Sequence, residues 1–321
     1  MKENLPRISQ ATDMRDIHSC LEENYNALSI DWYLILDKWM YNSYSVFKDH
    51  EKYLILILLV KRTFDYYTTN FVQLDWNQFF ALKKIELKKF SVIDISKELR
   101  ISKETARRKI LELEEDGILI KNKKSIAVTL KAGLLQRPEN TINSFSKILQ
   151  YVSWLLHKEK KVKKYYNKDF FVKKISDRFT QILAIFLEYQ IEYLLVRKAI
   201  ANNDMETWFI VGSLLYNQIM FLKKSEKKSH YQKEWIEEVL DVGNKKGINA
   251  MSISDLTGIP RPTVIRKLKL LLKENDIYKD KENLYYITDG KLFSKLNKQR
   301  LINIRKLSHI ISRINNIVFF S

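Results

Sequence analysis

One segment of this chain occurs twice, in two similar copies. Residues 94–119 read DISKELRISKETARRKILELEEDGIL, and residues 252–278 read SISDLTGIPRPTVIRKLKLLLKENDIY. Aligning Thr105 with Thr263 gives an offset of 263 − 105 = 158 residues. The same offset pairs Ile95 with Ile253, Ile101 with Ile259, Arg108 with Arg266 and Lys109 with Lys267. Five identities at one offset indicate an internal duplication.

Matches upstream of this segment extend the repeat. Asp49 and Asp204 each precede an apolar run, which is the pattern of an acidic N-cap followed by a buried helix. Trp76 and Trp235 each begin a helical pattern ahead of the repeated segment. The sequence therefore predicts that a whole half of the chain is repeated.

The joint between the halves is expected where helix breakers gather. Gly133 and Pro138 stand in a polar stretch, residues 130–145, of a chain with only 7 glycines and 4 prolines. Because both residue types interrupt regular structure, this stretch predicts a linker. We therefore expect an N-terminal half at residues 1–135 and a C-terminal half at residues 136–321.

The scarcity of glycine and proline also predicts long helices. Apolar residues at three- and four-residue intervals indicate helices over residues 32–47 and 179–200. A basic helix is expected over residues 292–317, without a counterpart at the end of the first half. The run YLILILLV, residues 53–60, is too short to cross a bilayer and predicts a buried helix.

The net charge of the chain indicates its kind of binding partner, and its cysteine content indicates its cellular compartment. The formal net charge is +18 and the pI is about 9.6, which predicts an anionic partner, either nucleic acid or an anionic membrane surface. Cys20 is the only cysteine, so the chain has no internal disulfide and no thiolate zinc cluster. Residues 1–16 lack the apolar core of a signal peptide. We expect a cytoplasmic protein that is not inserted in a membrane.

The first copy has the pattern of two short helices joined by a tight turn. Asp94 is expected to cap the first helix, residues 100–102 to form the turn, and Ser102 to cap the second helix. The inward residues of the first helix are Ile95 and Leu99. Those of the second are Ala106, Ile110 and Leu113, an i, i+4, i+7 stripe.

The second copy keeps this pattern with different residues. Gly258 stands in the turn, where a positive φ costs little only for glycine. Pro260 and Pro262 fall at the start of the second helix, where backbone amides are unpaired in any case. The inward stripe is Val264, Leu268 and Leu271.

Each second helix is followed by the pattern of a β-hairpin. In the first copy Gly117 ends the helix, and residues 118–120 form the first strand. Residues 121–124 form a basic turn, and residues 126–130 form the returning strand. In the second copy Asn275 ends the helix, and residues 277–278 form the first strand. Residues 279–281 form a charged turn, and residues 284–288 form the returning strand.

Two helices followed by a hairpin resemble the winged helix-turn-helix transcription regulators of bacteria, broadly of the IclR and MarR kind. The stretch LTGIPRPTVIRKL is similar to the IclR-type pattern, and LRISKETARRKILELEEDGIL is similar to the more general bacterial form. The resemblance covers about residues 76–130 and 235–288, and no part of the chain matches the IclR effector-binding domain. It implies a mainly α fold with small β-wings, in which tandem winged helix-turn-helix units are internally duplicated and related by a pseudo-two-fold.

The resemblance implies that the N-terminal part of each second helix meets base edges in the major groove. Arginine pairs with guanine, threonine bonds a base edge or touches a thymine methyl group, and basic residues of the wing hold phosphates. Glu104 either favours the helix dipole or accepts from a cytosine amino group. The candidate DNA-binding residues of the first unit are Ser102, Lys103, Thr105, Arg107, Arg108, Lys109, Lys123 and Lys124. Those of the second unit are Arg261, Thr263, Arg266, Lys267, Lys279 and Lys281.

Residues 158–174, KEKKVKKYYNKDFFVKK, interleave eight lysines with four aromatic residues. This pattern fits a contact with phosphates or unpaired bases, and it equally fits a solvated helix end with its aromatic residues packed inward. The five histidines are scattered, and neither HExxH nor GxxxxGK[ST] occurs. We therefore expect no enzymatic activity, no cofactor and no metal.

The function that these features favour is a sequence-specific regulator of transcription that places two recognition helices in successive major grooves of double-stranded DNA. A plasmid or phage replication initiator with two winged helices is an alternative, and a protein-interaction scaffold is a second. Basic residues at the exposed positions argue against the scaffold, because docking faces are rich in aromatic and aliphatic residues. A homodimer and RNA polymerase stay open as further partners.

Overall fold

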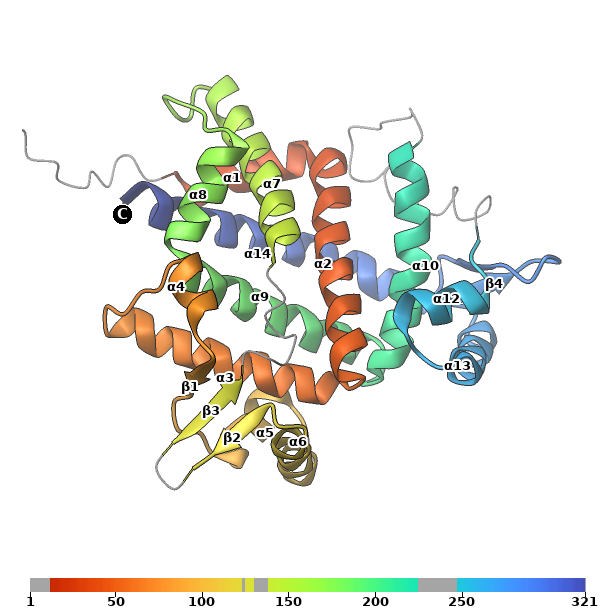
Figure 1. Cartoon of the computed structure of the whole chain (residues 1–321). Coiled ribbons are helices and arrows are strands. Elements are labelled where there is room, and N and C mark those ends of the chain that lie inside the picture. The colour runs from red at the N-terminus through yellow and green to blue at the C-terminus, as the bar shows by residue number, and fades with distance from the viewer. Residues whose placement is uncertain (1–11, 123–124, 130–137, 225–246, 321) are drawn as a thin grey trace, which may run out of the picture. The chain divides into compact units, whose positions relative to one another are not determined.

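The computed structural model describes residues 12–122, 125–129, 138–224 and 247–320, and these form mainly helices (Figure 1). The helices up to residue 115 are α1 (Met14–Glu23), α2 (Tyr25–Phe47), α3 (His50–Thr69), α4 (Trp76–Ala81), α5 (Val92–Leu99) and α6 (Lys103–Glu115). Those that follow are α7 (Glu139–Lys158), α8 (Lys168–Asp177), α9 (Phe179–Ile200), α10 (Met205–Lys224), α12 (Ala250–Thr257), α13 (Arg261–Lys273) and α14 (Lys291–Phe320). The strands are β1 (Lys84–Glu86), β2 (Leu119–Lys121), β3 (Ile126–Thr129), β4 (Ile277–Lys279) and β5 (Tyr285–Ile287). This confirms the expected mainly α fold with small antiparallel β-sheets.

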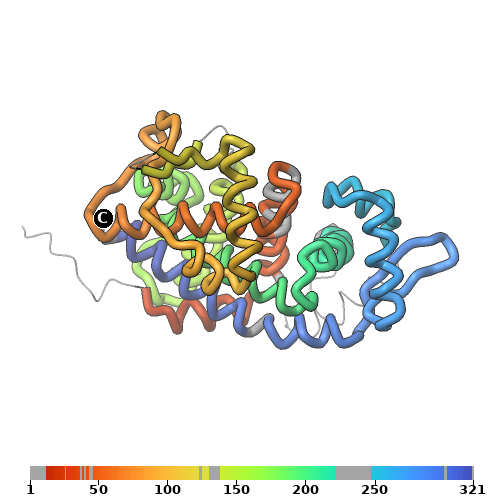
Figure 2. Tube along the Cα trace, turned by 90° about the horizontal axis from the view of Figure 1, so that it is seen from below, coloured from red at the N-terminus to blue at the C-terminus, as the bar shows by residue number. Residues whose placement is uncertain are grey.

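The chain divides into two compact units, each built from segments distant in the sequence. The first unit contains residues 1–17, 49–195 and 308–321, and the second contains residues 18–48 and 196–307. Figure 2 follows the chain through these segments by colour. The border of the units does not coincide with the expected joint near residue 135, because α7, α8 and most of α9 belong to the first unit.

An aromatic cluster explains why the first unit continues past residue 135. The ring of Phe179, the first residue of α9, lies 5.1 Å from the rings of both Trp76 and Phe79. Beside this cluster the amide of Leu74 donates to the hydroxyl of Thr180 over 3.1 Å, across 106 residues of sequence. Local composition carries no signal for contacts of such separation, so the border could not be read from the linker-like stretch.

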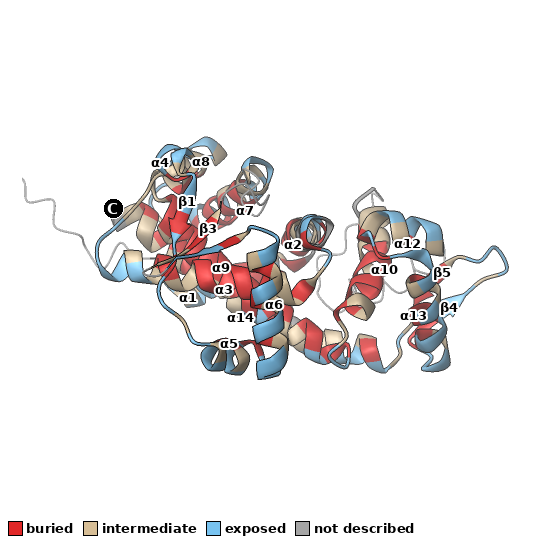
Figure 3. Ribbon diagram, turned by 60° about the horizontal axis from the view of Figure 1, so that its bottom comes forward, coloured by how far each residue is buried: buried red, intermediate tan, exposed pale blue. Residues whose placement is uncertain are grey.

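Helix α3 forms the buried support of the first unit. Asp49 caps it by accepting from the Lys52 amide, as expected. All eight residues of the run at 53–60 are buried, which confirms the prediction of a buried helix. Burying a large apolar side chain contributes roughly 1.5–3 kcal/mol. Both α5 and α6 pack on α3, and Figure 3 shows its buried surface next to α6.

A three-stranded antiparallel sheet, in the order β1-β3-β2, flanks this helix pair. Ile85 of β1 and Leu119 of β2 both pair with Val128 of β3. The hairpin of β2 and β3 was expected, whereas β1 was not. The second unit has the hairpin of β4 and β5, and Ile248 bridges Tyr285 on the far edge of β5.

Within the residues that the structure describes, α9 alone is long and apolar enough to cross a membrane by composition. Its most apolar window is 72% buried inside the protein. The same residues contain no group of three or more histidine, cysteine or acidic side chains placed to hold a metal ion.

Candidate nucleic-acid interface

The first helix-turn-helix consists of α5, a three-residue turn and α6. Ser91, not Asp94, caps α5, because its side chain accepts from the Asp94 amide and the helix begins at Val92. Arg100 closes α5 in the left-handed region, at φ 52°. The hydroxyl of Ser96 donates to the Ile101 carbonyl over 2.7 Å and fixes the turn. The turn thus directs the chain straight into the next helix.

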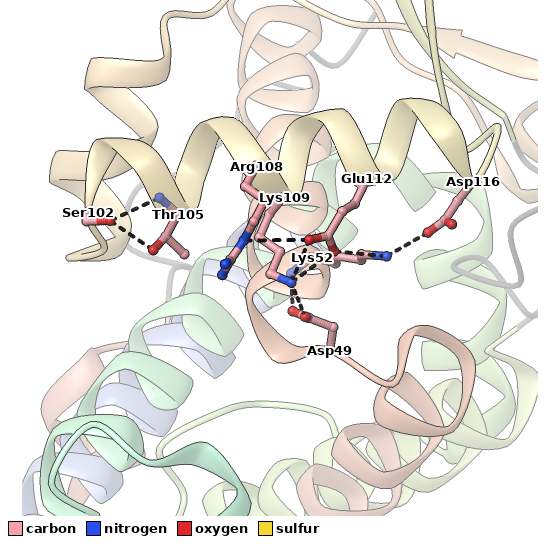
Figure 4. A network of polar contacts seen from close by, with 8 residues as sticks. All are labelled: Asp49, Lys52, Ser102, Thr105, Arg108, Lys109, Glu112 and Asp116. Atoms are coloured by element: carbon pink, nitrogen blue, oxygen red, sulfur yellow. Dashed lines mark hydrogen bonds and ion pairs between the residues drawn. The ribbon is translucent and has the colours of Figure 1, made fainter.

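Helix α6 begins at its expected cap (Figure 4). The Ser102 hydroxyl oxygen accepts from the Thr105 amide over 3.0 Å and donates to the Thr105 hydroxyl over 2.8 Å. The expected stripe is buried, with Ala106 and Leu113 at 0% exposure and Ile110 at 7%. Its exposed positions in the first two turns are Lys103, Glu104, Arg107 and Arg108. The basic start of α6 is therefore open to a partner.

Lys109 was expected among the DNA-binding residues, but its side chain turns toward α3. Its ammonium group lies 2.7 Å from the carboxylate of Asp49 and 2.9 Å from Glu112, and its side chain is only 12% exposed. Burial disfavours the charged form of Lys109, but the hydrogen bonds to Asp49 and Glu112 outweigh burial and raise its pKa. Lys109 fastens α6 to the start of α3, so we leave it out of the proposed DNA-contacting set.

Further charges join the same contact (Figure 4). Lys52 of α3 lies 2.8 Å from Asp116 and 3.3 Å from Glu112. Hydrogen bonding to Lys109 lowers the pKa of Glu112, despite an opposing effect of burial. Arg108 lies 3.7 Å from Glu112, yet its side chain is 62% exposed. The acidic far end of α6 therefore pairs with α3, while Arg108 can still reach outward.

The second helix pair, α12 and α13, has the same local construction. Asn249 caps α12, and Gly258 closes it at φ 72°. The hydroxyl of Ser254 donates to the Ile259 carbonyl over 2.7 Å, as Ser96 does to Ile101. Pro260 is the N-cap of α13 and Pro262 lies in its first turn, which confirms the helix start. The stripe Val264, Leu268 and Leu271 is buried.

Lys267 repeats the contact made by Lys109. Its side chain is 8% exposed and forms an ion pair with Asp204, the residue that precedes α10. Asp204 also accepts from the Thr207 amide over 3.2 Å, as a helix cap does. We therefore leave Lys267, too, out of the contact set. On α13 the exposed basic residues include Arg261, Arg266 and Lys269, and Thr263 is half-buried. Sequence reasoning missed Lys269, which the i+3 spacing from Arg266 places on the same face.

Both helix pairs end in the same way. Gly117 and Asn275 lie in the left-handed region, at φ 69° and 57°. The hydroxyl of Thr129 donates to the Gly117 carbonyl over 3.1 Å, and that of Thr288 to the Asn275 carbonyl over 2.7 Å. These bonds tie the returning strand of each hairpin to the end of the preceding helix.

The wings carry exposed basic residues. Lys121 in β2, Lys279 in β4 and Lys281 in the following turn are exposed. Asp280 orders that turn by accepting from the Tyr286 hydroxyl over 2.7 Å and from the Leu284 amide over 2.8 Å. The expected phosphate contacts Lys123 and Lys124 lie outside the described residues, as do Trp235 and the joint at 130–137.

Most aromatic residues of the segment 158–174 pack inward. Phe171 is fully buried, and the rings of Tyr166 and Phe170 stack at 4.2 Å. Phe319 of α14 lies 4.9 Å from Tyr166. Tyr165 stays 46% exposed.

A pair of short helices with a buried crossing, a capped second helix and a β-hairpin defines a winged helix-turn-helix. A family model, the DeoR-like helix-turn-helix domain, matches residues 85–127, which run from β1 into β3. No curated protein and no solved structure matches the chain. The match supports a DNA-binding regulator of transcription with DNA as its partner. The resemblance to the IclR and MarR kind stays a prediction.

Proposed function

We propose that this protein regulates transcription by binding a two-part site in double-stranded DNA, with α6 reading one part and α13 the other. The observation that carries this proposal is the basic, outward-facing start of α6 within the DeoR-like domain. A recognition helix meets base edges with its N-terminal residues, which here include Lys103, Thr105, Arg107 and Arg108.

The reading role of α13 rests on its likeness to α6. The two helices are each 13 residues long, and 261 − 103 = 158 is the offset of the sequence repeat. The turn bonds of Ser96 and Ser254 recur at the same offset, and so do the paired lysines Lys109 and Lys267. The aspartates that pair with these lysines are 204 − 49 = 155 residues apart. These correspondences support an internally duplicated pair of units, of which the second keeps the IclR-type stretch LTGIPRPTVIRKL.

The two helices carry different residues at some equivalent positions that are exposed or half-buried. Thr105 and Arg108 have the counterparts Thr263 and Arg266, but Arg107 corresponds to Ile265. Arginine reads guanine, whereas an aliphatic side chain contacts the thymine methyl group. The two parts of the DNA site therefore share some bases and differ in others, so the site is asymmetric.

The test begins with sheared genomic DNA of the source organism. The full chain is incubated with the fragments at near-physiological salt, and the bound fragments are sequenced. Enrichment of a few intergenic fragments with a shared asymmetric motif supports the regulator. Enrichment of repeats at a single origin instead identifies a replication initiator, and no enrichment overturns sequence-specific binding.

The second step uses variants on the recovered site. Arg108→Ala and Arg266→Ala are each expected to weaken binding by about 1–3 kcal/mol if the arginine contacts a base. Arg15→Ala is the matched control, because Arg15 is 88% exposed, pairs only locally with Asp13 among the described residues, and carries the same charge. Affinity of both recognition-helix variants equal to that of the control removes these arginines from the interface.

A further inference from the structure

One face of α7 carries aromatic and basic side chains that the winged helices do not use. Lys147, Tyr151, Trp154 and Lys158 follow one another at spacings of four, three and four residues, so they lie along one side of the helix. We name this set the α7 stripe. Trp154 is 41% exposed, and Lys147 and Lys158 are exposed.

The two aromatic rings of the α7 stripe already stack on each other. The rings of Tyr151 and Trp154 are stacked, with centroids 5.8 Å apart and an angle of 21° between their planes. The Lys158 ammonium lies 5.3 Å from the Trp154 ring, a cation–π contact with a flexible side chain. Because these contacts already hold the exposed tryptophan in place, it loses little further conformational freedom when a partner stacks on it.

The surroundings of the α7 stripe are strongly basic. Residues 144–168 contain seven lysines and a single acidic residue, Glu159. Lys161 pairs with Asp16 over 3.0 Å. Among the described residues, Lys147, Lys160 and Lys163 form no ion pair. From Lys147 to Lys158 the helix rises about 16 Å, enough to accompany several phosphates of one strand.

We infer that the α7 stripe binds single-stranded nucleic acid, with a base stacked on Trp154 and with Lys147 and Lys158 on phosphates. A duplex hides its base faces, so an exposed indole stacked on a tyrosine ring and flanked by lysines fits unpaired bases better. Because the surroundings of the α7 stripe are positively charged, a basic partner would be repelled. Within the first unit, α7 and α8 lie on the side away from α5 and α6 (Figure 1), so this surface is separate from the first recognition helix.

The test measures binding of the full chain to a labelled oligothymidylate of about twenty nucleotides by fluorescence anisotropy. Trp154→Ala is expected to weaken binding about tenfold, because loss of one base–aromatic stack weakens binding by a factor of roughly 5 to 150. Trp154→Phe should retain most of the affinity. Lys147→Gln with Lys158→Gln should weaken binding and reduce its dependence on salt.

The matched control is Tyr66→Ala. Tyr66 is 49% exposed, with Lys88 lying 5.8 Å from its ring, so it is the same kind of aromatic–lysine pair on a different helix. Its removal should leave oligothymidylate binding unchanged. An unchanged thermal midpoint of Trp154→Ala shows that the fold is retained.

Three results overturn the inference. Affinity of the Trp154→Ala and lysine variants equal to that of Tyr66→Ala shows that the α7 stripe does not bind the oligonucleotide. An equal loss on a random duplex of the same length shows a contact with phosphates alone. Binding of the chain to polyglutamate is measured in the same way. If the Trp154→Ala and lysine variants lose polyglutamate binding but keep oligothymidylate binding, the partner is an acidic polypeptide. Arg108→Ala and Arg266→Ala should not affect oligothymidylate binding, so this test and that of the proposed function fail independently.

Discussion

At the scale of single residues, the two turns differ at one position of high backbone cost. Arg100 and Gly258 are equivalent, since 258 − 100 = 158, and both have a positive φ, of 52° and 72°. A side chain with a Cβ pays about 1–2 kcal/mol in this region, whereas glycine does not. We predict that Gly258→Ala lowers the free energy of unfolding by about 1 kcal/mol, measured from the shift of the urea midpoint.

Position 100 provides the reverse experiment. Arg100→Gly removes the backbone cost but adds conformational freedom to the unfolded chain, and the two effects nearly cancel. Arg100→Ala keeps the cost and serves as the reference. We predict that the glycine variant is at least as stable as the alanine variant. A glycine variant less stable than the alanine variant by about 1 kcal/mol contradicts the idea of strain at this turn.

At the scale of elements, a lysine–aspartate pair holds each second helix to the start of a long helix. Asp49→Asn tests this contact, because asparagine also caps a helix and the substitution removes only the charge. Lys109 keeps Glu112 at 2.9 Å, so the expected loss is partial, about 1–3 kcal/mol in the free energy of unfolding. The measurement is chemical denaturation at neutral pH.

Acid should abolish the difference between Asp49→Asn and the unmodified chain. Burial raises the pKa of Asp49, but hydrogen bonds from Lys109 and the Lys52 amide outweigh burial and hold it below 3.8, the ordinary value. A lowered folded pKa stabilises the protein above the unfolded pKa, and this contribution is lost as the pH falls through the folded pKa. The two stability curves should therefore converge below pH 3.8.

A solvent-exposed pair provides the control for this prediction. Lys173 lies 2.7 Å from Asp177 on α8, but their side chains are 74% and 45% exposed. Exposed pairs contribute only about 0–1 kcal/mol. Lys173→Ala should therefore cost clearly less than Asp49→Asn. Equal losses would show that burial does not strengthen the pair of Lys109 and Asp49.

The sequence predicted the elements that depend on local signals. The cap at Ser102, the buried stripes of α6 and α13, and the glycine of the second turn were all correct, because their partners lie within a few residues. The role of Lys109 was not predictable, since its partner Asp49 lies 60 residues upstream, 109 − 49. The strand β1 was missed for a similar reason, because three residues without a turn signal gain their structure only by pairing with β3.

At the scale of the whole molecule, each proposed reading helix rests on a buried helix of its own unit. α6 packs on α3, and α13 packs on α10. The charge of +18 provides attraction to any DNA, but this attraction is independent of sequence and weakens with salt. Under the proposed function, sequence preference comes from the few exposed residues at the start of α6 and α13, and each unit contributes its part separately.

This separation leads to a prediction that pairs protein variants with DNA variants. In the recovered site, base changes are made in one part at a time, and binding is measured for the unmodified chain, Arg108→Ala and Arg266→Ala. Each arginine variant should become insensitive to base changes in one part and stay sensitive to changes in the other. Combining both substitutions should give the sum of the single losses within about 0.5 kcal/mol, as for independent sites. If both variants become insensitive to the same part, the two helices do not divide the site between them, and a single chain does not read both parts.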